Sequence, residues 1–303
     1  MDISERYVGC LLGLACGDAL GTTVEFSSRG SFEPLTDIVG GGLFDLLPGE
    51  WTDDTSMALC LGASLIHCKG FDPTDQMNRY CNWREVGYMS SNGRCFDIGL
   101  TTATALDKYL LTGDPFAGDT NHRSAGNGAL MRLAPIAMFY TQAEQDVFRF
   151  SGESTRVTHG AQEAIDCSRL FGLQLRRALL GGSKEQILKT KSLEPLSNKV
   201  LDIAEGRYLE KSISGITGSG YCVESLEAAL WCFAHSASYE EAVLKAANLG
   251  DDADTTAAIC GQIAGAFYGI NEIPKSWSRI LVMEAEISVM AMQLYSLAME
   301  RAT

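Results

Sequence analysis

Two short acidic segments carry the side chains best suited to catalysis or metal binding. Residues 52–55 read Thr-Asp-Asp-Thr, and residues 251–256 read Asp-Asp-Ala-Asp-Thr-Thr. Each segment precedes a small, apolar stretch with helical periodicity, and about two hundred residues separate them. If the fold brings them together, their carboxylates repel one another by several kcal/mol, even at an effective dielectric of about 20. Such a cluster requires cations.

The donor atoms of both segments are oxygens, with no Cys or His among them. Hard oxygen ligands favour Mg²⁺ or Mn²⁺ over zinc. The simpler interpretation is helix capping, because Asp and Thr accept hydrogen bonds from the free N–H groups at a helix start. One carboxylate suffices for a cap, whereas each segment has a second one beside it. We therefore predict metal binding, and we leave Asp251 out of the ligand set because it can simply face solvent.

The periodicity of the chain is mainly helical, and strand signals are scarce. We expect one all-α domain covering residues 1–303. The segments 27–50 and 112–127 are long loops, which in a compact domain are usually functional or mobile. The pattern predicts helices over residues 4–20, 54–67, 73–87, 98–110, 128–140, 143–150, 160–180, 184–189, 197–205, 222–236, 239–248, 254–268 and 276–300.

Glycine recurs every four residues in two of these helices, at positions 9, 13, 17 and 21 and at positions 261, 265 and 269. This spacing gives a helix a smooth face that another backbone can approach closely. Glycine inside a helix is about 1 kcal/mol less favourable than alanine, so its repeated use indicates a packing purpose. We expect these two helices to pack together and to draw the loops at their ends into one site.

The composition excludes several classes of protein. Hydrophobic residues make up 46% and charged residues 20% of the chain, which allows a sizeable core. The formal net charge of −14 repels nucleic acid and anionic membranes. The longest apolar stretch, 255–270, is too short to span a bilayer. We therefore expect neither a nucleic-acid partner nor a membrane.

The ten cysteines indicate the cellular compartment. None forms a C-x-x-C pair, and most fall in apolar helical patterns. This usage is typical of reduced thiols in a cytoplasmic protein rather than of a disulfide framework. The N-terminus lacks the basic start of a signal peptide. We expect a cytoplasmic protein and favour a monomer.

Further motifs occur at intervals along the chain. GDALG at 17–21 is followed by a glutamate, and SAGNGALMR at 124–132 follows a long loop and opens an expected helix. The small residues and backbone N–H groups of this second motif suit a diphosphate at a helix N-terminus. THG at 158–160 and GSGY at 218–221 precede two further expected helices.

The order of these motifs, together with WTDDT, CFDIG and GDDADTTAA, resembles the ADP-ribosylglycohydrolase family over about residues 8–269. The resemblance implies an all-α orthogonal bundle and a site for two Mg²⁺ or Mn²⁺ ions. It also implies removal of ADP-ribose from a modified acceptor, most often arginine in a protein. The residues that match the family's metal ligands are Thr52, Asp53, Asp54, Asp252, Asp254 and Thr255.

The resemblance also implies roles for residues outside the acidic segments. Glu25 matches an acidic residue near the site that can reach a metal or the water, and Asp97 matches a residue near the scissile ribose. With Asp53 and Asp254 they make up the expected catalytic set. The positions matching ligand-binding residues are Ser124, Gly126 and Asn127 for the phosphates, and His159 and Tyr221 for the ribose or adenine. Several relatives carry an aromatic residue after the serine, where this chain has Ala125. The acceptor preference therefore stays open.

Two alternatives remain at this stage. Either Glu25 or Asp97 can act as the base or orient the guanidinium leaving group. The protein can also cleave another ADP-ribosyl conjugate, of serine or of a small molecule, or be a noncatalytic ADP-ribose-binding or crystallin-like relative. The retained acidic segments argue against a purely structural role.

Overall fold

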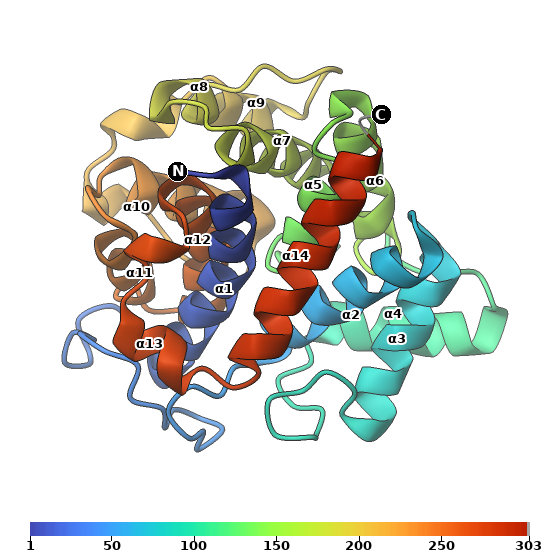
Figure 1. Cartoon of the computed structure of the whole chain (residues 1–303), viewed down its shortest axis with the longest axis horizontal. Coiled ribbons are helices and arrows are strands. Elements are labelled where there is room, and N and C mark those ends of the chain that lie inside the picture. Colours follow the sequence, from blue (N-terminus) through green and yellow to red (C-terminus); the bar gives the residue numbers. More distant parts are fainter. Residues whose placement is uncertain (302–303) are drawn as a thin grey trace.

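An antiparallel pair of helices, α1 (Ile3–Gly21) and α12 (Ala253–Tyr268), forms the centre of the bundle. The computed structural model describes residues 1–301. On one side of the pair, α12 is packed by α10 (Cys222–Ala234) and α11 (Tyr239–Ala247). On the other side, α14 (Glu284–Glu300) packs against α1 (Figure 1). Within residues 1–301 the extended pairings are isolated β-bridges, so the all-α expectation is confirmed.

The helices follow the predicted pattern with small shifts at most ends. The remaining helices are α2 (Asp53–Cys68), α3 (Pro73–Val86), α4 (Leu100–Thr112), α5 (Ala134–Phe139), α6 (Glu144–Arg156), α7 (Gln162–Leu179), α8 (Lys184–Leu188), α9 (Asn198–Ala204) and α13 (Lys275–Ile280).

The glycine stripes form the α1–α12 interface, as the spacing predicts. A β-carbon at Gly9 would lie 2.5 Å from the carbonyl oxygen of Gly265, and one at Gly13 or Gly17 would collide with the α12 backbone. At the end of α1, Gly21 lies against the Cα of Asp254. The stripe therefore places the last turn of α1 beside the first turn of α12, where the second acidic segment begins.

The N-terminal helix, rather than the expected stretch 255–270, has the length and apolarity of a membrane span. The stretch Ile3–Val24 has a mean hydropathy of 1.4, and 89% of it is buried inside the protein. Its apolar surface is covered by the other helices of the bundle, as expected for a core helix. All ten cysteines are free, and most are buried.

The helix predicted at 143–150 extends to Arg156 as α6, and two further predicted helices are wrong in their bounds. Residues 276–300 form two helices, because α13 ends at Ile280 and Met283 has a left-handed backbone (φ 58°). The break lets Val282 hydrogen-bond to the loop before α2: its N–H donates to Gly49 O at 3.0 Å, and its carbonyl accepts from Trp51 Nε1 at 3.0 Å. These long-range bonds replace local helical ones.

The other error concerns the helix predicted at 128–140, which begins only at Ala134. The preceding turns are held by the buried side chain of Gln262 on α12. Its Oε1 accepts from Ala134 N at 2.9 Å, and its Nε2 donates to the carbonyls of Leu130 and Met131. The expected phosphate loop is therefore fixed by a side chain from α12 rather than by a helix N-terminus that follows it directly.

Candidate active site

The two acidic segments meet at the end of α1. Carboxylate oxygens of Asp18, Asp54 and Asp254 lie within 4.8 Å of one another, and so do those of Glu25, Asp97 and Asp254. Asp254 belongs to both groups, and one of these groups joins α1, α2 and α12. The Thr255 hydroxyl lies 3.5 Å from Asp54 Oδ2. The predicted convergence of the two distant segments is thus present in the fold.

Asp18 orders the start of α2. Its Oδ1 accepts hydrogen bonds from the backbone N and the hydroxyl of Thr52, both at 2.9 Å. Its Oδ2 accepts from the backbone N of Thr55 at 3.0 Å and from the Thr55 hydroxyl at 2.6 Å. Because both oxygens are already bound, Asp18 holds the first acidic segment in place. The Thr52 hydroxyl also lies 3.1 Å from Asp54 Oδ2 and 3.3 Å from Asp254 Oδ2.

The cluster is buried and strongly anionic. Burial, together with neighbouring carboxylates, raises the pKa of Glu25 to about 9 and that of Asp97 to about 7. The same causes raise the pKa values of Asp53, Asp54 and Asp254 well above the usual range for a carboxyl. These groups cannot all be ionised at neutral pH unless positive charge is supplied.

The residues present fit a divalent cation. Glu25 Oε2 and Asp54 Oδ1 are buried and have no hydrogen-bond partner among the described residues. Such unpaired acceptors are costly in a dry interior. All surrounding donor atoms are oxygens, as Mg²⁺ and Mn²⁺ prefer. The starts of α2 and α12 also face the cluster, so their dipoles favour negative charge there.

A cavity of about 230 Å³ opens over this cluster. Asp53, Asp252 and Thr255 line its acidic side together with Glu25 and Asp97. Asp53 and Asp252 lie outside the two tight groups of carboxylates, and Asp252 Oδ2 is held by Asn127 Nδ2 at 2.8 Å. The cavity therefore joins the carboxylates to the expected phosphate loop.

The loop side of the cavity is made of glycines backed by a histidine. Gly126 and Gly128 line the cavity beside Asn127. Added β-carbons at Gly126 and Gly128 would each lie 3.2 Å from Nε2 of His159, so glycine is needed for the close approach of its ring. Asn127 N donates to Gly220 O at 3.1 Å, which ties the loop to the start of α10.

A buried chain of hydrogen bonds fixes the His159 ring. Arg132 Nη2 donates to the Thr158 hydroxyl at 2.6 Å, and that hydroxyl lies 2.8 Å from His159 Nδ1. Because an arginine only donates, the Thr158 hydroxyl accepts from Arg132 and keeps its own hydrogen for a bond to Nδ1. In the tautomer that accepts this bond, the ring proton lies on Nε2, at the cavity. Burial, assisted by the charge of Arg132, lowers the pKa of His159 to about 3, so the ring is neutral.

The structure separates two predicted ligand residues from the cavity. Ser124 is outside the lining, and its hydroxyl donates to Asp119 Oδ2 at 2.5 Å. The Tyr221 hydroxyl donates to Glu163 Oε2 at 2.5 Å and lines a different cavity. The backbone of Tyr221 still pairs with Gly126 in a β-bridge. Both residues thus border the phosphate loop without reaching the acidic cavity.

Sequence reasoning missed the start of α4 and the role of Arg132. Gly99 precedes α4 without a side-chain cap, and residues 99–102 line the cavity. An uncapped helix start leaves N–H groups free to bind an anion. The available signal for the start of α4 was Gly99, the last residue of the CFDIG motif. Arg132 stood out in the sequence only as the last residue of the SAGNGALMR motif.

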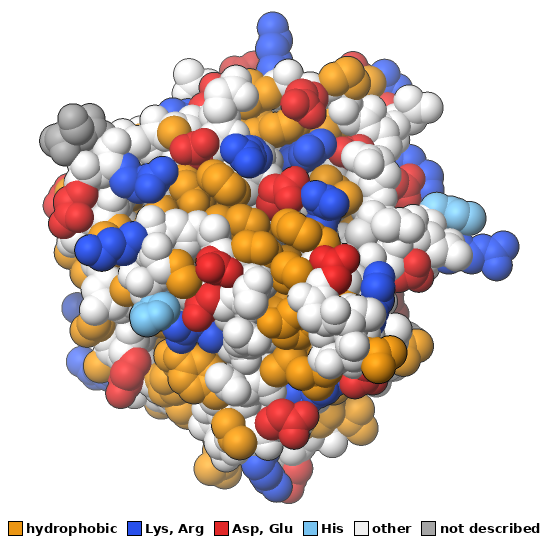
Figure 2. Space-filling view, turned by 90° about the vertical axis from the view of Figure 1, so that its right-hand side faces the viewer, with side chains coloured by type: hydrophobic (Ala, Val, Ile, Leu, Met, Phe, Trp, Pro, Cys, Tyr) orange, Lys and Arg blue, Asp and Glu red, His pale blue; other side chains and the backbone are white. Residues whose placement is uncertain are grey.

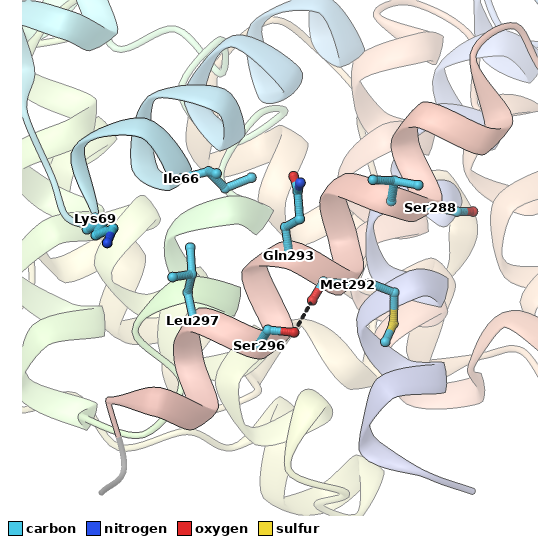
Figure 3. Close-up of a pocket in the computed structure, with 8 residues that line it drawn as sticks. Ile66, Lys69, Ser288, Met292, Gln293, Ser296 and Leu297 are labelled. Carbon is cyan, nitrogen blue, oxygen red and sulfur yellow. Dashed lines mark hydrogen bonds between the residues drawn. The ribbon is translucent and has the colours of Figure 1, made fainter.

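A larger cavity elsewhere lacks these chemical groups. It has a volume of about 610 Å³ and lies between the end of α2 and α14, with Ile66, Met292 and Leu297 among its lining residues (Figure 3). No carboxylate lines it among the described residues. On the face carrying α2–α4, side chains of both charges are interspersed with apolar ones (Figure 2). The acidic cavity is therefore the candidate active site.

Comparisons with known proteins agree with this choice. The family model described as ADP-ribosylglycohydrolase matches residues 1–303. The chain belongs to the ADP-ribosylglycohydrolase family. It is 45% identical to the ADP-ribosylarginine hydrolase Tri1 of Serratia proteamaculans, over 98% of this chain and 80% of that protein.

The matches to a second relative and to a solved structure also cover nearly the whole chain. The ADP-ribosyl-[dinitrogen reductase] glycohydrolase of Rhodospirillum rubrum is 31% identical over 94% of this chain and 92% of that protein. A solved structure, described as an ADP-ribosylglycohydrolase-related protein complex, is 42% identical with a TM-score of 0.86, and the match covers 98% of this chain and 99% of that one. The family-level fold and enzyme class predicted from the motifs are thus confirmed.

Proposed function

We propose that this ADP-ribosylglycohydrolase removes ADP-ribose from modified arginine side chains of proteins by cleaving the N-glycosidic bond at C1″ of the ribose. The proposal depends mainly on a cavity that Glu25 and Asp97 line beside the glycines of the phosphate loop, with Asp254 within 4.8 Å of both carboxylates. The 45% identity to an ADP-ribosylarginine hydrolase supports arginine as the acceptor.

Glu25 and Asp97 have different roles in this proposal. Glu25 is only 8% exposed, and its Oε2 has no partner. It takes a proton from the water that adds to C1″ as the bond to the guanidino nitrogen breaks. The departing guanidine receives this proton from Glu25 and leaves as guanidinium, and Asp97, which is less buried, would pair with its positive charge. Stabilisation of an oxocarbenium-like transition state by flanking carboxylates is usual in glycoside hydrolysis.

Metal binding completes the proposed site. Asp54 and Asp254 would hold the cations with the Thr52 and Thr255 hydroxyls, and Asp53 and Asp252 would contribute from the cavity side. Two ions of Mg²⁺ or Mn²⁺ agree with the two groups of carboxylates that share Asp254. A bound divalent cation would supply positive charge that lets these groups ionise together and makes a nearby water more acidic.

The ligand-binding residues have different parts in this proposal. Gly126, Asn127 and the Nε2–H of His159 contact the diphosphate or the adjoining ribose, because all three line the cavity. Ser124 and Tyr221 support the loop from outside. We also propose one domain over residues 1–303, which the whole-chain family match supports. The protein is proposed to be a cytoplasmic monomer, and the ten free cysteines support the cytoplasmic location.

The test is incubation with arginine-, serine- and small-molecule ADP-ribose conjugates, with and without a chelator. We expect release of ADP-ribose from the arginine conjugate, and we expect the chelator to abolish it. Release from the serine conjugate alone would show that the acceptor is serine rather than arginine. No release from any conjugate, with ADP-ribose still bound, would indicate a noncatalytic relative.

A further inference from the structure

We propose that an apolar collar at the mouth of the acidic cavity docks the protein that carries the ADP-ribose. The collar consists of Phe26, Leu43, Leu47 and Leu100. This inference rests on the proposed function and adds the class of substrate: an apolar and basic protein surface around the modified arginine, rather than the free modified amino acid.

Two collar residues belong to the cavity itself. Phe26 and Leu100 line it, although 64% and 84% of their respective surfaces are exposed. Phe26 also has a left-handed backbone (φ 59°), which is unfavourable for a bulky residue. The conformation is held by a hydrogen bond of 2.7 Å from Phe26 N to Asp251 O. A strained aromatic side chain at a cavity mouth indicates a contact with a ligand or partner.

The other two collar residues stand on a braced turn. The backbones of Gly41 and Leu46 exchange two hydrogen bonds, of 2.7 and 3.0 Å. Leu46 is buried beneath the turn, whereas Leu43 and Leu47 are each 67% exposed. Two exposed leucines side by side on an ordered turn are more typical of a binding surface than of apolar residues scattered singly over a surface.

The turn is fixed to residues that are close in sequence to both candidate catalytic carboxylates. The Thr23 hydroxyl donates to Gly40 O at 3.0 Å, two residues before Glu25. Phe44 packs against Phe96, next to Asp97, with ring centroids 5.3 Å apart. In this proposal, an acceptor whose ribose lies between Glu25 and Asp97 leaves the cavity past this turn. A protein acceptor reaches Leu43 and Leu47, but a free amino acid is too small to cover them.

The charge around the collar selects the kind of protein. The loop 27–50 contains four carboxylates and one guanidinium, that of Arg29. Arg29 is occupied by three backbone carbonyls, those of Leu249, Ile213 and Ile216. The facing loop, 87–99, contributes one cation, Arg94. This acidic border complements a basic surface and, with the net charge of −14, repels acidic proteins and nucleic acids.

The experiment compares two substrates of the full-length, metal-loaded enzyme: free ADP-ribosylarginine and a basic protein ADP-ribosylated on arginine. The variant is Leu43→Ser/Leu47→Ser. We expect kcat/KM on the protein to fall about tenfold, mainly through KM, because apolar contact is lost. On free ADP-ribosylarginine we expect no change.

The matched control is Leu110→Ser/Leu111→Ser, which removes two exposed leucines from the other end of α4. We expect it to leave both substrates unaffected. An unchanged rate on the protein in the collar variant, an equal loss on both substrates, or an equal loss in the control would each overturn the docking proposal. The proposed function fails separately, if the unaltered enzyme cleaves neither substrate.

Discussion

At the scale of single residues, the site depends on side chains whose orientations are fixed by hydrogen bonds. Asp18 accepts four hydrogen bonds from two threonines of the first acidic segment. His159 has its Nδ1 bound by Thr158, which is in turn bound by Arg132. Neither arrangement involves the ligand directly, but each decides which atoms face it.

The Thr158→Val variant tests the His159 arrangement. Valine keeps the shape of threonine but removes the hydroxyl, so Nδ1 loses its donor and the ring is free to change tautomer. We expect KM for an ADP-ribosylated substrate to rise about five- to tenfold, equivalent to about 1 kcal/mol, with little change in kcat. Imidazole ¹⁵N shifts should show the proton leaving Nε2.

A nearby threonine provides the control for this variant. Thr155 is also buried, and its hydroxyl donates to Ser151 O within α6. Thr155→Val should leave KM and the ¹⁵N shifts unchanged. If Thr158→Val behaves the same way, the hydroxyl does not set the tautomer.

At the scale of elements, the glycine stripe is what allows α1 and α12 to share one site. Gly17→Ala should lower the free energy of unfolding by at least about 2 kcal/mol, because its β-carbon would strike the backbone of Ala257. This loss outweighs the gain of about 1 kcal/mol in helix propensity. Denaturant unfolding monitored by circular dichroism measures it.

The control is Gly62→Ala in α2. There the new β-carbon would meet the flexible side chain of Met290 rather than backbone. We expect a change within about 1 kcal/mol of zero, since the gain in propensity offsets a small shift of the methionine. Equal destabilisation by both variants would show that the close backbone approach is not what requires glycine at position 17.

The helices and their glycine contacts were predictable from sequence, because periodicity and glycine spacing are local signals. The break at Met283 and the late start of α5 were not, since both depend on hydrogen bonds from distant residues, the loop before α2 and Gln262. The meeting of the acidic segments followed from the motifs. The placement of Ser124 and Tyr221 beside the cavity depended on tertiary contacts that no motif records.

At the scale of the whole molecule, the acidic cluster links stability to pH. The folded pKa values of Glu25 and Asp97, about 9 and about 7, lie above the usual 4.5 and 3.8. The folded protein therefore binds more protons than the unfolded chain between these values. The stabilisation is fully present below about pH 4 and is lost as pH rises through about 7 and then about 9.

We expect the Tm of the metal-free protein to fall as pH rises from 5 to 9. The free energy of unfolding should decrease by about 1.4 kcal/mol per pH unit for each excess proton bound. Saturating Mn²⁺ should flatten this dependence, because the cation replaces the protons and binds only the folded state. Thermal melts with EDTA and with Mn²⁺ measure both curves. A Tm that is independent of pH in EDTA would contradict the raised pKa values of these groups.

We propose above all that segments about two hundred residues apart bind the same divalent ions. Crystals grown with Mn²⁺ and measured at the manganese absorption edge test it most directly. We expect anomalous peaks in contact with carboxylate oxygens of both Asp54 and Asp254. Density that shows no manganese between them, or manganese bound to one segment only, would contradict it.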